Sequence, residues 1–470
     1  MNFKTIFKSL KNKDMRKRIF AVVGILIVYR FLAHIPVPLG DQATFKQAID
    51  NFINGSDFGG FINLISGGGL TNFSILLVGL SPYITASIVM QLLTKAIPRM
   101  EELNKDGEAG RRKISQWTRM LTVPLAVLQS VAYIFILFQE LIASNTGGSV
   151  EVSFQSWALA VTSMTAGSII LMWLGELITE QGIGNGISTV ILCSIASSLP
   201  VTAAQFGQAL FDTSAGTLSL FGWFNLPVNP TMFWTILGII VGMLIVLYIL
   251  VKINEAQRII TINYAKRVHG NSAYGGIKSI IPIKLIAAGV VPVIFAVAFL
   301  SVPAFIGQII LRADSGSQIA QNMVSWFSAP SARTFDSNVG LQAKDFIYPT
   351  LYFLLVVMFT YFYTSIVFNS QEIAENLQKQ GGFIEGVRPG KQTEIYFSKV
   401  VNHLNLFGAL ALGLIALLPY IVDYIFIVTT GAPLGLSISG TGLLIVVTVA
   451  LENMRQINSR ALMVTYDDYQ

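Results

Sequence analysis

Ten apolar runs of roughly 20 residues, the length that crosses a bilayer, recur along this chain and constrain its fold most strongly. The chain is 53% hydrophobic and 12% charged, against roughly 25% charged in soluble domains. Lipid admits only helices or closed barrels, because every backbone polar group needs an internal partner there. We therefore predict an all-α integral membrane protein. The predicted spans are about 19–35, 71–93, 119–143, 157–178, 187–206, 232–253, 284–308, 346–368, 400–423 and 434–451.

Lysine and arginine residues set the orientation of these spans. With a cytoplasmic N-terminus, the cytoplasmic segments carry 26 of them and the outer segments 4, while Arg30 lies inside the first span. By the positive-inside rule, both termini are predicted to be cytoplasmic. The net charge of +6 is then mainly a topology signal. Residues 1–18 alternate apolar and basic side chains, which predicts an amphipathic helix on the membrane surface.

The stretch 58–94 departs from the pattern of plain spans. A short apolar segment, 58–65, precedes three glycines at 67–69, and the apolar run 71–93 follows. Glycine loses the most backbone entropy on ordering, so three in a row predict a hinge. At about 1.5 Å per residue, the short segment cannot cross a hydrocarbon core of about 30 Å. We predict a re-entrant half-helix, lying in a cavity and hinged onto a full spanning helix.

Two predicted cytoplasmic segments are longer than a connection requires. Residues 252–284 contain a β-type stretch, a polar tip at 269–272 and a second stretch, which predicts a hairpin. Residues 370–399 contain a Pro-Gly turn directly after Arg388. Both segments carry several lysine and arginine residues. They fit a docking surface for a large cytosolic partner or simply solvated charge, and composition does not separate the two.

No enzyme or metal-site pattern emerges from the sequence. His34, His269 and His403 lack metal-ligand spacing, and the single cysteine, Cys193, excludes an intrachain disulfide. The glycine-rich stretch 181–187 fails the phosphate-loop pattern and is predicted to be a tight turn between two helices. Coupled carriers place ionisable residues near the midplane, and this chain has almost none there. We expect a passive conduit without a cofactor, and not an enzyme.

A series of motifs runs in order along nearly the whole chain. They are Ile35-Pro36-Val37-Pro38, Ser66-Gly67-Gly68, Ser81-Pro82-Tyr83-Ile84-Thr85-Ala86-Ser87, Gly110-Arg111-Arg112-Lys113-Ile114-Ser115, Trp173-Leu174-Gly175-Glu176, Gly182-Ile183-Gly184-Asn185-Gly186-Ile187-Ser188, Asn263-Tyr264-Ala265-Lys266-Arg267 and Arg388-Pro389-Gly390. Together they resemble the SecY family, the channel-forming subunits of bacterial protein translocons. The resemblance implies two pseudo-symmetric, inverted halves of five helices around an hourglass pore. The N-terminal half is 19–211, the C-terminal half is 212–453, and a cytoplasmic tail follows at 454–470.

The resemblance also implies the site residues. The short re-entrant segment, about 57–70, corresponds to a plug, whose plug and hinge residues are Phe61, Ile62, Leu64, Ile65, Gly67, Gly68 and Gly69. An aliphatic pore ring corresponds to Leu80, Ile84, Ile187, Ile191, Ile294 and Ile445. The lateral gate corresponds to Gln91 and Ile286, and docking of the ATPase SecA or the ribosome to Arg258, Lys266, Arg267 and Arg388. Many bacterial members have asparagine at the Ile286 position on the seventh helix, so a more apolar closed gate is expected here.

The function that the resemblance implies is translocation of unfolded, signal-sequence-bearing polypeptides and lateral insertion of membrane proteins into the bilayer. The expected setting is the bacterial plasma (inner) membrane, with SecE and SecG as membrane partners. Three alternatives stay open. They are a secondary transporter of a small solute, a membrane-embedded enzyme, and an accessory paralogue within the same family.

Overall fold

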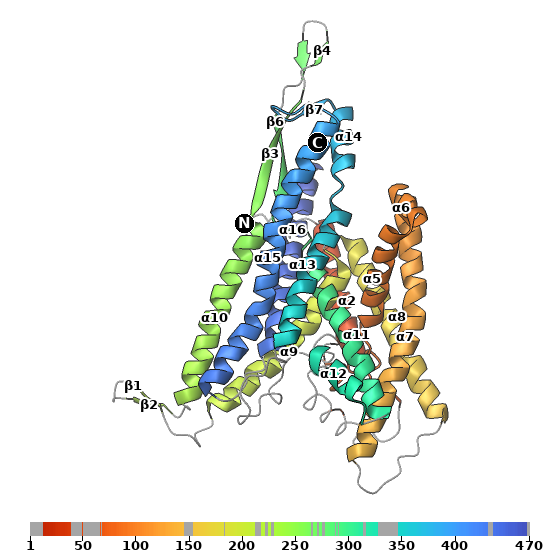
Figure 1. Cartoon of the computed structure of the whole chain (residues 1–470), viewed down its shortest axis with the longest axis vertical. Coiled ribbons are helices and arrows are strands. Elements are labelled where there is room, and N and C mark those ends of the chain that lie inside the picture. Colours follow the sequence, from red (N-terminus) through yellow and green to blue (C-terminus); the bar gives the residue numbers. More distant parts are fainter. Residues whose placement is uncertain are drawn as a thin grey trace. The chain divides into compact units, whose positions relative to one another are not determined.

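The computed structural model of the 470-residue chain is shown in Figure 1. It describes residues 13–38, 49, 66, 68–144, 154–182, 184–211, 218–220, 224–226, 230–264, 267–269, 272–274, 278–286, 288–289, 291–313, 316–327, 346–430 and 436–467. Long helices follow the predicted spans in order. They are α2 (Lys13–Leu32), α5 (Ser81–Ala96), α7 (Glu108–Ser144), α8 (Phe154–Gln181), α9 (Gly186–Leu210), α10 (Pro230–Glu255), α11 (Val291–Ala313), α13 (Ile347–Val367), α15 (Lys391–Thr430) and α16 (Leu436–Asp467). Short helices α6 (Pro98–Lys105), α12 (Gln318–Phe327) and α14 (Ser370–Lys379) lie between them in the sequence.

Among the described residues, six helical stretches are long and apolar enough to cross a membrane, judged by length and composition. They lie in α7, α8, α10, α11 and α15 and in Ile347–Lys379, which begins with α13. These six coincide with predicted spans. A shorter apolar helix, Gly186–Ser197, forms the first part of α9. The spans predicted at 19–35, 71–93, 187–206 and 434–451 stay predictions.

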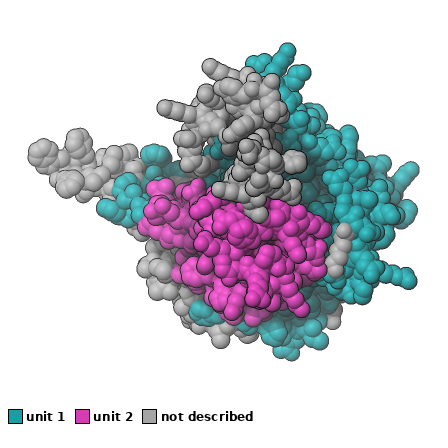
Figure 2. Space-filling view, turned by 90° about the horizontal axis from the view of Figure 1, so that it is seen from above, with its two compact units in different colours: residues 1–242, 298–348, 423–470 teal, residues 243–297, 349–422 magenta. Residues whose placement is uncertain are grey.

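The chain divides into two compact units, which Figure 2 shows in different colours. Unit 1 comprises residues 1–242, 298–348 and 423–470, and unit 2 comprises residues 243–297 and 349–422. The sequence-based halves 19–211 and 212–453 stay a prediction.

Two helices begin later than the sequence predicted. Residues 68–80 form turns, and the helix expected from Thr71 begins only at Ser81. Gly79 has a φ of 62°, and Pro82 lies in the first turn of α5, where a proline costs no hydrogen bond. The span expected from residue 284 likewise begins at Val291 with a proline second, after Gly289 with a φ of 63°. The two predicted helix starts were therefore wrong. Apolar composition continues through the residues before each helix, and it does not show that the helix begins only next to the proline.

The hairpin predicted at 252–284 is confirmed and belongs to a three-stranded sheet in unit 2. Strand β3 (Gln257–Tyr264) pairs antiparallel with β6 (Lys278–Lys284) and with β7 (Gly382–Phe383), in the order β6-β3-β7. Pro282 is tolerated because β6 is an edge strand. A second hairpin, β4 (Arg267–His269) and β5 (Ser272–Tyr274), lies at the tip in Figure 1. Strands β1 (Leu218–Leu220) and β2 (Phe224–Leu226) form a separate hairpin in unit 1.

Strand β7 joins the two long segments 252–284 and 370–399, which the sequence did not predict. Below the sheet lies a core of buried residues from β3, β6, α14, α15 and the turn after β7. Its members are Ile260, Ile262, Ile283, Leu377, Ile384, Phe397 and Val401. The side chains of Leu377 and Tyr264 occupy the space that a Cβ at Gly382 would need, so glycine lets the strand approach this core. The two segments thus form one platform.

Candidate functional site

The centre of unit 1 contains backbone that is buried but not helical. We call Ser66 together with residues 68–80 the buried segment; it consists of turns directly before α5. The Val37 N–H donates to the carbonyl of Phe73 at 2.8 Å, and the Ile75 N–H donates to the carbonyl of Ile35 at 3.0 Å. The segment's own turns are closed by further backbone bonds, such as Ser74 N–H to Gly69 at 2.8 Å. Non-helical backbone at membrane depth is tolerated where protein surrounds and satisfies it in this way.

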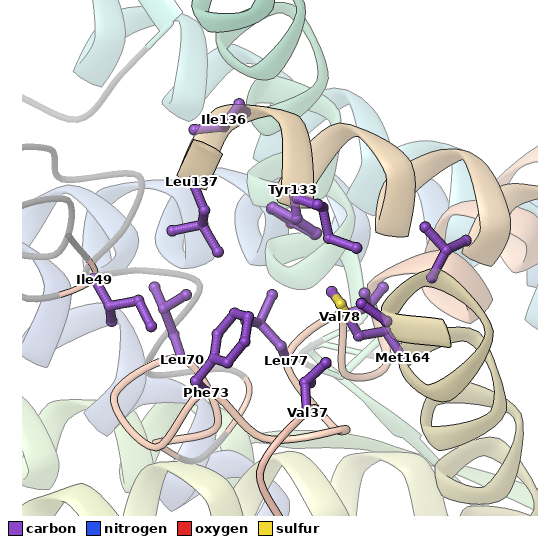
Figure 3. Packing of buried hydrophobic residues seen from close by; sticks show 13 residues of the cluster. Val37, Ile49, Leu70, Phe73, Leu77, Val78, Tyr133, Ile136, Leu137 and Met164 are labelled. Carbon is purple, nitrogen blue, oxygen red and sulfur yellow. The ribbon is translucent and has the colours of Figure 1, made fainter. Parts of the chain in front are cut away.

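Apolar side chains hold the buried segment against α7 and α8. Figure 3 shows Leu137 and Tyr133 of α7 directed toward the loop that carries Leu70, Phe73 and Leu77. Among the described residues, the buried cluster comprises Val37, Ile49, Leu70, Phe73, Leu77, Val78, Tyr133, Ile134, Ile136, Leu137, Ala160, Val161 and Met164. Phe73 has a φ of 45°, which is an outlier for a bulky residue. Such strain persists only where the surroundings determine the conformation, as this packing does.

Helix α8 approaches the buried segment closely enough to exclude a side chain. A Cβ at Gly167 would meet the backbone carbonyl of Ile75. One residue later, the Ser168 hydroxyl donates to the carbonyl of Gly79 at 2.9 Å and satisfies a buried acceptor. The segment is therefore fixed to α8 at two successive positions.

A polar contact fixes the start of the buried segment to α2 and α9. The Tyr29 hydroxyl lies 2.6 Å from the hydroxyl oxygen of Ser194 and donates to the carbonyl of Ser66 at 3.3 Å. Either hydroxyl can be the donor between Tyr29 and Ser194, and the Ser194 hydroxyl also lies 2.9 Å from the carbonyl oxygen of Val190. The next residue of α2, Arg30, donates from Nη1 to the hydroxyl of Ser197 at 2.9 Å, one turn beyond Ser194 on α9. Buried polar groups of this kind rigidify a packing arrangement when satisfied.

The plug prediction falls largely outside the described residues. Phe61, Ile62, Leu64, Ile65 and Gly67 are not among them. Of the predicted hinge, Gly68 has a φ of 84°, a left-handed value that favours glycine. A Cβ at Gly69 would lie 3.2 Å from the side chains of Ser66 and Ser74. The described part of the hinge is a tightly packed turn in this structure.

Five of the six predicted ring residues lie in unit 1. Leu80 and Ile84 are buried at the start of α5, joined by a backbone bond from Ile84 N–H to the Leu80 carbonyl at 3.0 Å. Ile191 of α9 and Ile445 of α16 are also buried. Ile187 is half-buried, and its Cγ1 lies 3.2 Å from the Cβ position of Gly175 on α8. The sixth, Ile294, is half-buried on α11 in unit 2. The ring itself stays a prediction.

The predicted gate residues lie in different units. Gln91 of α5 donates to the Ser87 hydroxyl at 3.1 Å, and its own side-chain oxygen is buried without a hydrogen-bond partner among the described residues. Ile286 precedes α11 and so is not on a helix, contrary to expectation. It is buried, and its Cγ1 lies 3.6 Å from the Cβ position of Gly408 on α15. Their role as gate residues stays a prediction.

The predicted docking residues belong to the platform in unit 2. Arg258 on β3 and Arg388 in the turn after β7 are exposed. The carbonyl of Arg388 accepts a bond from the buried Thr393 hydroxyl at 2.9 Å, which fixes this turn to the start of α15. Arg267 lies on β4, and Lys266 lies outside the described residues.

Sequence reasoning missed the residues that fix the buried segment, Tyr29, Gly167, Ser168 and Ser194. Small residues in predicted spans were the available signal, since Gly and Ser let membrane helices approach closely. Their partners lie far away in the sequence, so the pattern alone could not identify them.

Comparison with known proteins settles the family. The sequence model of the SecY family matches residues 74–454. The chain belongs to the SecY family. A relative named Protein translocase subunit SecY, from Streptomyces scabiei, is 37% identical over 98% of each chain. The relative of that name from Mycobacterium tuberculosis (strain ATCC 25618 / H37Rv) is also 37% identical over 98% of each.

Solved structures share the fold at lower identity. "The structure of a protein conducting channel" gives a TM-score of 0.61 at 18% identity and covers 93% of this chain and 90% of that one. "Sec61 in the Canine ribosome-channel complex from the endoplasmic reticulum" gives 0.59 at 16% identity, covering 93% and 90%. The SecY-type fold and the apolar helices together make this chain a multi-pass membrane protein.

Proposed function

We propose that this chain is the pore-forming subunit of a protein-conducting channel. It translocates unfolded secretory polypeptides across a bacterial plasma membrane and inserts membrane proteins laterally into it. The observation that carries this proposal is the identity of 37–38% over 98% of the chain to relatives named Protein translocase subunit SecY. These relatives lend no support to the alternative of a small-solute transporter. In this role the channel itself catalyses no reaction.

The proposed pore has ten spans in two inverted halves, with both termini cytoplasmic. The ring of Leu80, Ile84, Ile187, Ile191, Ile294 and Ile445 closes the throat. An aliphatic constriction blocks ions by dewetting and offers no specific bonds to a passing chain, so it accepts any sequence. The plug, about residues 57–70, closes the outer side, and its base continues into the buried segment.

The platform in unit 2 is the proposed docking surface for SecA or the ribosome. Its two segments share a sheet and a core, so Arg258 and Arg388 are carried on one rigid element. Exposed cations of this kind steer an acidic or nucleic-acid-rich partner electrostatically. SecE and SecG are the proposed membrane partners.

A crosslink at Ile191 tests the proposed function. A photoreactive amino acid at this position is expected to form an adduct with a secretory chain stalled during export, because the ring contacts every passing polypeptide. The control is the same amino acid at Leu128 of α7, which is 61% exposed on the outside of unit 1 and is expected to react with lipid. If position 191 reacts no more with the stalled chain than position 128 does, the proposal is wrong.

Replacing Ile286 with asparagine is expected to increase export of proteins with weakly hydrophobic signal sequences. Ile286 is buried, and an amide buried there without a partner costs about 1–3 kcal/mol. If Ile286 belongs to the proposed gate, this cost falls on its closed state. Pulse-labelled export measures the effect. Ile280→Asn is the matched control, because Ile280 is 57% exposed on β6. Equal export by both variants would show that Ile286 is not a gate residue.

A further inference from the structure

The turn between α8 and α9 gathers residues from both ends of the chain. Gln181 is the last residue of α8, and its carbonyl accepts from Arg18 Nη1 of α2 at 3.3 Å. The same carbonyl accepts from Arg460 Nη1 of α16 at 3.4 Å. The last carbonyls of a helix have no partner within the helix and carry its negative partial charge. Two guanidinium groups at this position satisfy the carbonyl and stabilise the helix end.

The glycines of this turn are explained by what lies beside them. A Cβ at Gly182 would occupy the space of the Arg460 guanidinium, and a Cβ at Gly184 would occupy that of the Asn453 amide. Both glycines also have positive φ values, 68° and 135°. The turn is therefore shaped to receive α16, in addition to reversing the chain.

Helix α16 also reaches the first turn of α9. Asn453 Nδ2 lies 3.1 Å from the Thr189 hydroxyl and donates to it, while that hydroxyl donates to the carbonyl of Asn185 at 2.9 Å. Asn185 caps α9, because its side-chain oxygen accepts from the N–H groups of Ile187 and Ser188. The network thus ends at the turn of α9 that carries Ile187, and Ile191 follows one turn later.

We propose that Arg460, Arg18 and Asn453 form a clasp that positions the start of α9. Arg460 is the central member, because it contacts both the carbonyl of Gln181 and the face of Gly182. The clasp thereby orients Ile187 and Ile191, a consequence that rests on the proposed function of the ring. All of these residues lie in unit 1.

Cys193 supplies a reporter that does not depend on transport. It is the only cysteine in the chain, and it is half-buried on α9, two residues after Ile191. In membranes containing the full chain, Arg460→Gln is expected to accelerate labelling of Cys193 by N-ethylmaleimide several-fold. Arg460→Lys keeps a cation at the end of α8 and is expected to restore most of the protection. Equal labelling in wild type and Arg460→Gln would overturn the clasp, whether or not the variant exports protein.

Gly182→Ala tests the same contact from the other side. Gly107→Ala is its matched control, because Gly107 has a similar φ of 74° but no atom of the described part of the chain within 4 Å of its Cβ position. Gly182→Ala is expected to accelerate Cys193 labelling and to lower the amount of folded protein far more than Gly107→Ala. In an Arg460→Ala background, the added effect of Gly182→Ala is expected to fall to that of the control. If Gly182→Ala and Gly107→Ala behave alike while Arg460 is present, the guanidinium does not lie there and the clasp is wrong.

Discussion

Gly167→Val is expected to prevent stable packing of α8 in unit 1. The Cβ alone would overlap the backbone carbonyl of Ile75, and the Leu76 Cδ2 lies 3.3 Å from the same point. Overpacking costs about 1–3 kcal/mol where side chains can shift, and more where backbone must move. Here the backbone is held by the Ile75 bond to Ile35 and by Ser168 on α8 itself. We therefore expect a loss above about 3 kcal/mol, among the largest for a single change.

The measurement for Gly167→Val is the thermal unfolding midpoint of the detergent-solubilised protein, with its level in membranes. Gly24→Val is the matched control, because no atom of the residues that the structure describes lies within 4 Å of the Cβ position of Gly24 on α2. This control measures the effect of a valine in an apolar helix where its Cβ overlaps no backbone carbonyl. Similar midpoints for the two variants would show that α8 does not approach the buried segment as closely as described.

The sequence predicted the long apolar helices and the hairpin well, because each has a strong local signature. Helices α7 and α8 follow from apolar runs, and β3 and β6 from β-type stretches around a polar tip. The residues before α5 were predicted wrongly because a buried turn and a spanning helix have the same apolar composition. Leu76 and Leu77 are fully buried in turns, although they would fit a helix equally well. The usable signals were Gly79 and Pro82.

The ring residues could not be derived from periodicity, and they came only from the resemblance to SecY. Aliphatic residues of the same kind face outward elsewhere, as Leu128 and Leu244 do. The contacts of Tyr29 with Ser66 and Ser194 were missed because they join residues 37 and 165 positions apart. Such contacts depend on how helices pack, and a single sequence carries no direct record of that packing.

Phe397→Ala is expected to unfold the platform in unit 2. Phe397 is fully buried beneath the three-stranded sheet, in the same cluster as Ile260 and Leu377, and its ring lies 6.4 Å from that of Phe368. Truncating a buried phenylalanine costs about 3–5 kcal/mol, through lost transfer energy and the cavity left behind. Strand β7 pairs with β3 through two residue pairs, Asn263 with Phe383 and Tyr264 with Gly382, so it is expected to separate from β3 when this core is weakened.

Trypsin cleavage of inverted membrane vesicles measures this effect. Cleavage within 252–284 and 370–399 is expected to accelerate at least tenfold. A tenfold change corresponds to a loss of about 1.4 kcal/mol in the free energy of unfolding, which is less than the loss expected here. Phe407→Ala is the control, because Phe407 lies on the same helix, α15, and is 64% exposed. A surface substitution of this kind changes stability by about 0.5 kcal/mol or less. Binding of SecA or ribosomes is expected to weaken with Phe397→Ala alone, because Arg258 and Arg388 would no longer share one rigid element. If Phe397→Ala is cleaved as slowly as Phe407→Ala, then the folding of segments 252–284 and 370–399 does not depend on this core.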